Sequence, residues 1–259
     1  MKFDDLDQRM RIFETASDYS VLPGVYMVAR IDGRSFTRLT KEVHKFEAPF
    51  DIRFRDMMVE TVKHLMNCGF TVIYGYTESD EISLLFSQHE NAFSRKLRKY
   101  NSVLAGEASA KFSLLINDVA TFDCRISQLP SRKDVVDYFQ WRNQDALRNS
   151  LNAYCYWKLR ENGKTARQAT KIMLGMTVSD KNELLFQYGI NFNEVPAWQK
   201  RGIGFYWQEY EKKGLNPKTG EKTVAVRRKI FVDEELPVRE SYGFLIEKIL
   251  ESDALKVSM

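Results

Sequence analysis

Residues 25–36 read Val-Tyr-Met-Val-Ala-Arg-Ile-Asp-Gly-Arg-Ser-Phe, and residues 76–86 read Tyr-Thr-Glu-Ser-Asp-Glu-Ile-Ser-Leu-Leu-Phe. Each stretch sets an aspartate beside an apolar run: Asp32 follows the first run, and Asp80 precedes the second. If the two runs are neighbouring antiparallel strands, both carboxylates meet at one edge of a sheet. Mg²⁺ prefers oxygen ligands such as carboxylates and phosphates. The pair therefore predicts a two-metal site for nucleotidyl transfer.

The flanking sequence supplies the other elements of an α+β core. We expect strands over residues 25–31, 70–74, 82–86 and 119–126, a helix from Asp51 to Met66 and a second helix at 92–116. Residues 32–50 are expected to form a loop and 77–80 a turn. The resulting order, β-α-β-β-α-β, is that of ferredoxin-like folds. In that topology the first and third strands are adjacent and antiparallel, which again places Asp32 beside Asp80.

The rest of the chain is predicted to add helices and a hairpin to this core. Helices are expected at 3–20, 131–161, 165–174, 179–188 and 241–250, with a loop at 195–198. Strands at 202–210 and 223–232 should form a C-terminal hairpin with its turn at 215–220. We therefore expect a catalytic core over residues 1–135 and an extension over 136–259 that packs on it as one continuous unit.

Composition excludes several classes of protein. The 259 residues carry a net charge of +4 and only three histidines, which are scattered, so a zinc hydrolase or a histidine-based triad lacks its residues. No phosphate-binding loop of the Gly-x4-Gly-Lys-Ser/Thr type is present. The three cysteines predict no disulfide framework, which favours the cytoplasm. No apolar run approaches the ~18 residues that span a membrane, and the acidic N-terminus does not resemble a signal peptide.

Each motif has an ordinary alternative. An Asp-Gly pair after a strand is usually a turn, yet the backbone amides of residues 33–37 could also cradle a triphosphate. Two facing carboxylates repel each other unless a cation lies between them, which favours a metal site. The basic cluster at 95–99 is either a solvated helix face or a phosphate-binding surface. Trp141 is expected to belong to the core, and Arg142 to pair with Asp145 three positions later.

Five strings of residues, taken in order, resemble one known family. They are residues 30–36 and 76–81, quoted above, Phe-Asp-Cys-Arg at 122–125, Trp-Arg-Asn-Gln-Asp at 141–145 and Asp-Lys-Asn-Glu at 180–183. The chain resembles the tRNA-His guanylyltransferase-like proteins, which are 3′-to-5′ tRNA polymerases. The likeness extends over residues 3–232.

This resemblance implies a polymerase- or cyclase-type palm with two Mg²⁺ ions per active site, and it assigns roles residue by residue. Asp32 and Asp80 would be catalytic and would ligate the metal together with the backbone carbonyl of Gly33. The incoming nucleotide, ATP, GTP or another nucleoside triphosphate, would be held by Asp32, Gly33, Arg34, Ser35, Phe36, Thr37, Ser79 and Asp80. Triphosphates or the tRNA 5′ end would contact Lys96, Lys99, Arg125, Lys181 and Asn182. The family resemblance also implies a homotetramer.

Three departures separate this chain from the members that guanylylate tRNA-His. Residues 147–153 read Leu-Arg-Asn-Ser-Leu-Asn-Ala where those members have His-Ile-Asn-Asn-Leu-Tyr-Asn, Ala48 replaces a lysine, and Thr37 replaces a histidine. The chain therefore resembles the bacterial and archaeal "like" branch, which implies templated repair of 5′-truncated tRNA. The alternatives are addition of the −1 G to tRNA-His, a nucleotide cyclase or cyclic-dinucleotide synthase, and a non-catalytic tRNA-binding protein.

Overall fold

A six-stranded antiparallel sheet organises the chain in the computed structural model, which describes residues 2–215 and 222–257. The strands are β1 (Tyr26–Arg34), β2 (Val72–Glu78), β3 (Glu81–Phe86), β4 (Thr121–Leu129), β5 (Ile203–Leu215) and β6 (Lys222–Asp233). They lie side by side in the order β4-β1-β3-β2-β5-β6. The first four form the predicted ferredoxin-like core, and the pairing of β1 with β3 is antiparallel, as expected. The prediction of an α+β fold is confirmed.

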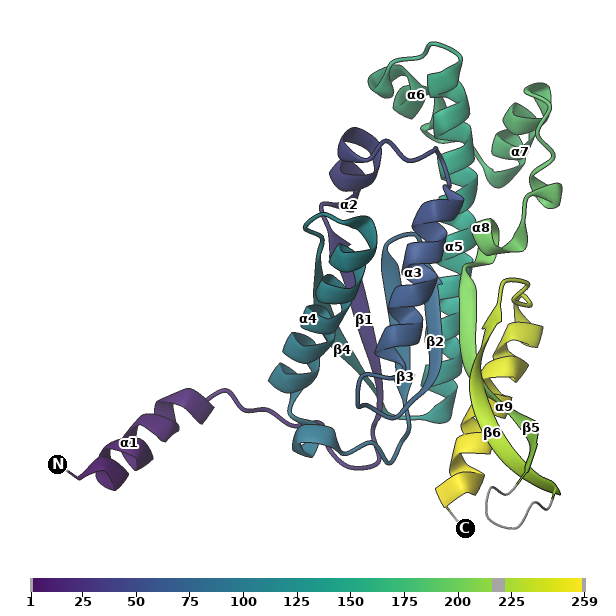
Figure 1. The fold of residues 1–259 in the computed structure, drawn as a ribbon. Helices are drawn as coiled ribbons and strands as arrows, with labels where there is room; N and C mark the ends of the chain where they lie inside the picture. The colour runs from purple at the N-terminus through teal and green to yellow at the C-terminus, as the bar shows by residue number, and fades with distance from the viewer. Residues whose placement is uncertain (1, 216–221, 258–259) are drawn as a thin grey trace.

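Helices cover both faces of the sheet (Figure 1). One face carries α3 (Ile52–Leu65) and α4 (Leu97–Ile116), which pack on Ile31, Leu84 and Phe86. The other face carries α5 (Arg132–Glu161) and α9 (Glu240–Val257), which pack on strand residues such as Tyr74 and Leu85. Since the central strands are buried on both sides, their sequences read as continuous apolar runs.

The extension continues the core's sheet instead of forming a separate one. Strand β5 pairs with β2, from Tyr74–Tyr206 to Thr77–Ile203. Helix α5 begins at its cap Ser131 and runs for 30 residues along the sheet and past its end, where α6 (Ala166–Met173) and α7 (Val178–Gln187) pack on it (Figure 1). The core and the extension therefore share the sheet, and residue 135 lies in the first turns of α5.

Several strand boundaries differ from the sequence prediction. Strand β1 continues to Arg34, because both of its neighbours supply backbone partners beyond Ile31, so Asp32 and Gly33 belong to the strand and not to a loop. Strand β2 spans 72–78 in place of 70–74, since β3 and β5 both pair with its second half. β5 and β6 are longer than expected. The predicted hairpin turn at 215–220 falls almost entirely outside the described residues.

Helix boundaries differ as well. The expected loop 32–50 contains α2 (Phe36–Arg38) and a π-helical turn, Leu39–Val43. The helix expected from residue 92 begins with a separate 3₁₀ turn, Ala92–Arg95, before α4. The predicted loop 195–198 follows a 3₁₀ turn, Phe192–Glu194, and runs into α8 (Ala197–Arg201). In the described part of the chain, no helix combines the length and apolar character that crossing a bilayer requires.

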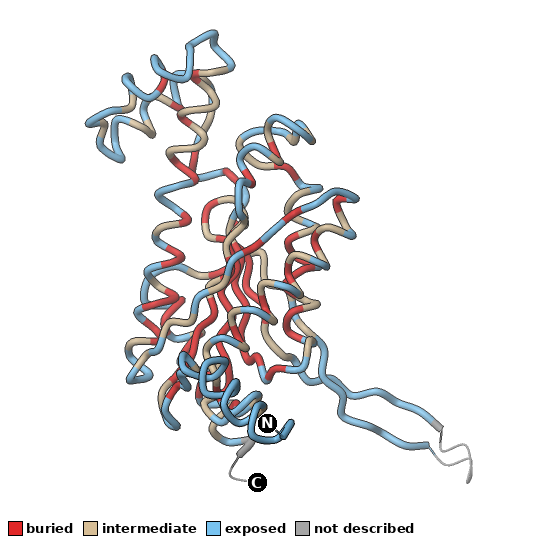
Figure 2. Tube along the Cα trace, turned by 90° about the vertical axis from the view of Figure 1, so that its left-hand side faces the viewer, coloured by how far each residue is buried: buried red, intermediate tan, exposed pale blue. Residues whose placement is uncertain are grey.

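Two segments reach away from the body of the molecule. Helix α1 (Phe3–Thr15), which is shorter than the predicted 3–20, buries none of its residues and extends outward from the sheet (Figure 1). The outer part of the β5–β6 hairpin is a two-stranded ribbon with exposed residues on both strands (Figure 2).

Candidate active site

The two predicted aspartates come together at one end of the sheet. Strands β2 and β3 are joined by a two-residue turn, Ser79 and Asp80. The amide of Gly33 donates a hydrogen bond of 3.1 Å to the carbonyl of Asp80, which fastens this turn to the end of β1. In the strand register, Asp32 lies opposite Glu81, the residue after Asp80. Burial raises the pKa of Asp80, and the nearby negative charge of Asp32 raises it further.

Gly33 is required by a close approach to a core side chain. A Cβ atom at this position would lie 2.5 Å from the ring of Phe36. That ring is buried and packs against Phe112 and Phe122, at centroid distances of 5.1 and 4.8 Å. The side chain of Phe36 is therefore part of the core, although the residue also lines the pocket. Ser35 has a φ of 61°, and this left-handed residue turns the chain from β1 into α2.

A buried network of charged side chains adjoins the aspartates. Arg142 of α5, which is 2% exposed, donates to both carboxylate oxygens of Glu81 at 2.7 and 2.9 Å and to Glu78 at 3.2 Å. Arg30 pairs with Glu81 and lies 3.4 Å from Asp32. Burial raises the pKa of Glu78 to about 8, with a further contribution from the charge of Glu81. The network links the extension to the two strands that carry the aspartates.

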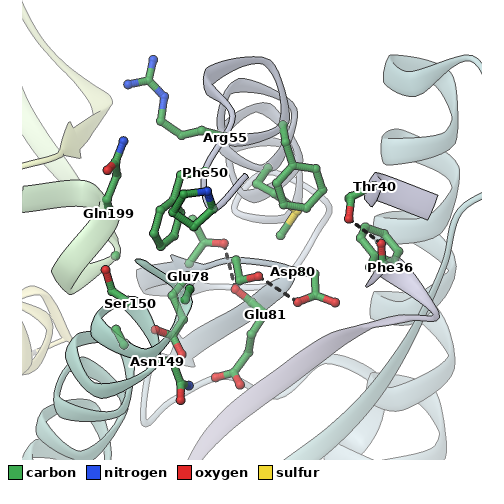
Figure 3. Close-up of a pocket in the computed structure, with 18 of the residues that line it drawn as sticks. Phe36, Thr40, Phe50, Arg55, Glu78, Asp80, Glu81, Asn149, Ser150 and Gln199 are labelled. Carbon is green, nitrogen blue, oxygen red and sulfur yellow. Dashed lines mark hydrogen bonds between the residues drawn. The ribbon is translucent and has the colours of Figure 1, made fainter. Parts of the chain in front are cut away.

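A pocket of about 470 Å³ opens beside the aspartates (Figure 3). This volume lies in the range that holds a small-molecule ligand or cofactor. Asp80, Thr40 and Phe36 lie at one side of it, and Phe50, Arg55 and Gln199 at the other (Figure 3). Two cation–aromatic pairs also line it. The amine of Lys41 lies 5.6 Å from the ring centroid of Trp157, and the guanidinium carbon of Arg55 lies 5.1 Å from that of Trp198.

The predicted nucleotide-binding residues divide into two groups. Asp32, Phe36, Thr37, Ser79 and Asp80 line the pocket. Gly33, Arg34 and Ser35 belong to the same segment but do not line the pocket. If they contact a bound nucleotide, they do so at the rim of the pocket or with backbone groups.

The predicted phosphate-binding residues also divide. The guanidinium of Arg125 on β4 lies 3.5 Å from a carboxylate oxygen of Asp32, so the structure brings Arg125 to the site. Lys181 lines a separate groove between α5, α6 and α7, which adjoins the main pocket at Ala153. The side chain of Asn182 donates to the carbonyl of Val178 within α7.

Lys96 and Lys99 lie far from the aspartates in the same chain. Lys96 pairs with Asp18 at 2.7 Å, and the neighbouring Arg95 donates to the carbonyl of Val25, just before the start of β1. Asp32 is seven residues further along, which is about 23 Å at the ~3.3 Å rise of a strand. Arg95 is 5% exposed and holds backbone carbonyls, so it is a structural residue. A role for Lys96 and Lys99 remains a prediction.

The sequence did not predict the network of Glu78, Glu81, Arg30 and Arg142. It also did not predict that Trp157 and Trp198 line the pocket. The acidic residues were visible within the quoted string 76–81, but their partner lies on α5, more than 60 positions away. Arg142 does pair with Asp145, at 3.1 Å, as expected, and this is one of its three acidic partners. The notable error concerns Trp141, which is 54% exposed instead of buried.

The residues at the aspartate pair fit Mg²⁺. Within residues 2–215 and 222–257, no cluster of three or more His, Cys, Asp or Glu side chains forms a complete metal centre. Mg²⁺ commonly binds through one or two carboxylates, with waters and substrate phosphates as its other ligands. Asp32 and Asp80, with the carbonyl of Gly33, offer such a set, and the raised pKa of Asp80 shows that a cation there would relieve an electrostatic penalty.

A ferredoxin-like sheet with two neighbouring carboxylates beside a pocket of this size is an arrangement that nucleotidyltransferases and nucleotide cyclases share. Residues 7–130 match the family model of tRNA(His) guanylyltransferase, and residues 133–240 match that of the same family's C-terminal domain. The chain belongs to the tRNA(His) guanylyltransferase family. The two matched regions meet where α5 begins.

Individual relatives agree with this assignment. A probable tRNA(His) guanylyltransferase of Drosophila melanogaster is 35% identical over 195 residues, covering 71% of this chain and 68% of the relative. A bacterial tRNA(His) guanylyltransferase-like protein in complex with GTP superimposes with a TM-score of 0.74 at 28% identity, over 95% of this chain and 99% of the other. The same kind of protein in complex with ATP gives a TM-score of 0.73, with the same identity and coverage.

Proposed function

We propose that this chain is a Mg²⁺-dependent nucleotidyltransferase that adds nucleotides in the 3′-to-5′ direction to the 5′ end of tRNA, and that its main task is templated repair of 5′-truncated tRNA. The observation that carries the proposal is the meeting of Asp32 and Asp80 beside the pocket, through the hydrogen bond from Gly33 to Asp80. The family assignment, and the GTP and ATP bound by similar proteins, support it.

The chain's own residues would hold the metal, fix the position of the Asp32 carboxylate and orient the nucleotide. Asp32, Asp80 and the carbonyl of Gly33 would hold the metal, which when bound lowers the pKa of an attacking hydroxyl and offsets the charge of the phosphates. Arg30 and Arg125 flank Asp32 and hold its side chain in place. Backbone groups of residues 33–37 and the side chain of Ser79 would contact the triphosphate, and this role is supported by Phe36, Thr37 and Ser79 lining the pocket.

The reaction forms a phosphodiester bond at the 5′ end of the RNA. The 3′-hydroxyl of the incoming nucleotide attacks the activated 5′-phosphate, loses its proton, and displaces pyrophosphate or AMP. A 5′-monophosphate would first be adenylylated by ATP, with release of pyrophosphate. No histidine lines the pocket in the described part of the chain, and His44 and His64 pair with Asp118 and Glu107 elsewhere. The arrangement is consistent with chemistry that does not depend on a histidine base.

Two of the three departures from the guanylylating members reach the pocket, whereas Ala48 does not line it. Thr37 lines it, and so do Ser150 and Ala153 from the altered segment 147–153. A changed lining at these positions supports a changed substrate, which is why we favour repair over addition of the −1 G.

We further propose that the enzyme acts in the cytoplasm as a homotetramer. All three cysteines are free thiols, which suits a reducing compartment. Helix α1 presents apolar side chains to solvent, with Phe3 77% and Phe13 74% exposed, and this supports association with further copies of the chain.

Transfer of a labelled nucleotide to tRNA lacking its first 5′ residue, compared with full-length tRNA-His, tests the proposal. We expect Mg²⁺-dependent, template-matched addition to the truncated tRNA. Asp32→Asn and Asp80→Asn should lose at least about 1,000-fold in turnover, since each removes a charge on which the transition state depends. Asp137→Asn, which changes an exposed carboxylate paired with Lys133, is the matched control and should react normally.

Two other outcomes would contradict the proposal. A cyclic product from nucleotide alone, without RNA, would identify a cyclase. Tight tRNA binding without any incorporation of label would identify a non-catalytic binding protein.

A further inference from the structure

Trp141 is an exposed aromatic residue held rigidly in place. Its ring packs edge-to-face on Tyr138, with centroids 5.9 Å apart at an angle of 79°, and the guanidinium carbon of Arg142 lies 4.7 Å from its centroid. Both neighbours are themselves fixed: Tyr138 is buried and bonded to Ser83, and Arg142 is bonded to three carboxylates. More than half of Trp141 nevertheless faces solvent. A large apolar side chain that is rigid and open on one side suits a planar ligand.

This residue lies close to the aspartates but outside the pocket. Arg142 connects it to Glu81, and Arg30 connects Glu81 to Asp32. Arg30, Glu81 and Arg142 all line the pocket, whereas Trp141 does not. Trp141 contacts Arg142 without being part of the lining, so its exposed side lies outside the pocket. The pocket has room for about one nucleotide, so a second substrate must approach Asp32 from elsewhere.

The surface around Asp32 carries cations. In the register of β1 with β4, Asp32 and Arg34 lie on the same face of the sheet as Arg125, the face that α5 partly covers. Arg125 has 60% of its side chain exposed, and Arg34 is exposed as well. Asp123, opposite Asp32 on the edge strand β4, is the acidic residue on this strip. Two exposed arginines leading to Asp32 match the charge of an RNA backbone.

We propose that Trp141 is the stacking platform for the 5′-terminal base of the RNA, with Arg125 on the phosphate that enters the reaction. The proposal rests on the function proposed above and names where its second substrate sits. The open face of the ring takes the base, and Arg142 covers the opposite side. Arg142, Glu81 and Arg30 connect the ring to Asp32 in a continuous series of contacts, along which one nucleotide would place its base on the ring and its phosphate toward the carboxylate. Stacking does not depend on base identity, as an enzyme that extends many tRNA ends requires.

A 5′-truncated tRNA acceptor-stem duplex with 2-aminopurine as its 5′-terminal nucleotide tests the platform directly. We expect the full-length protein to quench this probe and to leave an interior 2-aminopurine unchanged. Trp141→Ala should abolish the quenching and weaken RNA binding about 5- to 150-fold, the range found for loss of one base–aromatic stack. Trp141→Phe should retain part of both. The KM for tRNA should rise in Trp141→Ala, while the KM for the nucleotide stays the same.

Phe244→Ala is the matched control, because Phe244 is 66% exposed on α9, on another part of the surface. It should behave as the wild type. Equal RNA affinity and equal quenching in wild type and Trp141→Ala would overturn the platform while leaving nucleotidyl transfer intact. A change of oligomeric state in Trp141→Ala, without a change in quenching, would assign the ring to a protein interface and also overturn it. If the wild type adds no nucleotide, the proposed function fails, yet the binding and fluorescence measurements still decide the role of Trp141.

Discussion

Ionisation of Glu78 lowers the free energy of unfolding. Its carboxyl is buried at the pocket, and burial raises its pKa to about 8, well above the ~4.3 of a free glutamate. Between these two values the folded state binds more protons than the unfolded state, so the free energy of unfolding must fall as the pH rises from about 4.5 to about 8. The carboxylate is kept despite this cost because it is one of the groups that hold Arg142.

Glu78→Gln should remove this pH dependence. The amide keeps an oxygen for Arg142 but carries no charge, so the variant should match the wild type near pH 4.5 and exceed it by about 1–3 kcal/mol at pH 8, since one pKa unit corresponds to ~1.4 kcal/mol. Urea unfolding at several pH values measures the difference. Glu60→Gln, on the exposed side of α3, should show no such trend. A stability difference that stays constant with pH would show that Glu78 titrates normally.

Gly33 is a second residue whose identity the structure explains. An alanine here would place its Cβ 2.5 Å from the ring of Phe36, which is buried against Phe112 and Phe122 and cannot withdraw without disturbing the core. Gly33→Ala should therefore destabilise the fold by about 1–3 kcal/mol, the usual cost of overpacking, and should reduce nucleotide addition. Gly106→Ala provides the contrast: nothing lies within 4 Å of its Cβ position on α4. That variant should gain up to about 1 kcal/mol from helix propensity. Thermal unfolding that ranks the two variants the other way would contradict the packing argument.

For single residues, the sequence predicted only those positions that follow from local spacing along the chain. The positions of Asp32 and Asp80 next to apolar runs were enough to bring them to one end of the sheet, because strand pairing brings their ends together. The acidic partners of Arg142 could not be foreseen, since the bonds join α5 to strands over 60 residues earlier. Trp141 was misjudged because aromatic residues on a buried helix usually face the core, and sequence does not say which face of α5 the sheet leaves open.

At the scale of elements, Arg142 joins α5 to the β2–β3 hairpin that carries Asp80. Removing one partner of a buried ion pair leaves the others without a countercharge. Arg142→Met should therefore cost about 3–5 kcal/mol and should loosen the hairpin, which lowers the rate of nucleotide addition. Arg148→Met removes an exposed arginine that shares Asp145 and should change stability by less than ~1 kcal/mol.

A combined variant separates charge from packing. Arg142→Met together with Glu78→Gln and Glu81→Gln removes three charges, and the remaining Arg30 and Asp145 keep Asp32 and Arg148 as partners. It should recover most of the stability lost in Arg142→Met, while activity stays low because the hairpin is no longer held. If the combined variant were as unstable as the single one, the loss would come from packing of the arginine side chain and not from its charge.

Elements themselves were predicted better than their ends. Helices α3 and α5 begin at the capping residues that the sequence marked, Asp51 and Ser131, whose side chains accept from backbone amides in the first turn. The strands were predicted too short because their ends are set by partners: β1 reaches Arg34 only because β4 supplies Thr121 opposite it. Such pairing depends on tertiary structure and leaves no local pattern of hydrophobicity.

At the scale of the whole molecule, the sheet makes the core and the extension interdependent. The face of the sheet under α5 and α9 buries Val28, Tyr74 and Leu85 completely, and the hydroxyl of Tyr74 bonds to that of Tyr242 on α9 at 2.9 Å. Strand β2 also has its outer edge covered by β5. A core cut off from these elements would expose a large apolar face and an unpaired strand edge, both of which favour aggregation.

A chain ending at residue 131 should therefore fail to fold, even though it contains the complete β-α-β-β-α-β unit and both aspartates. We expect it to be insoluble or to bind a hydrophobic dye and lack the near-ultraviolet circular dichroism of packed aromatic rings. Deletion of residues 1–16 is the contrasting cut, because α1 buries none of its residues within a single chain. This variant should still fold cooperatively, and a smaller oligomeric state would show that α1 holds copies of the chain together. A stable monomer of residues 1–131 would show that the catalytic core is an independent domain, with the extension needed only for the pocket wall that α5 and α8 supply.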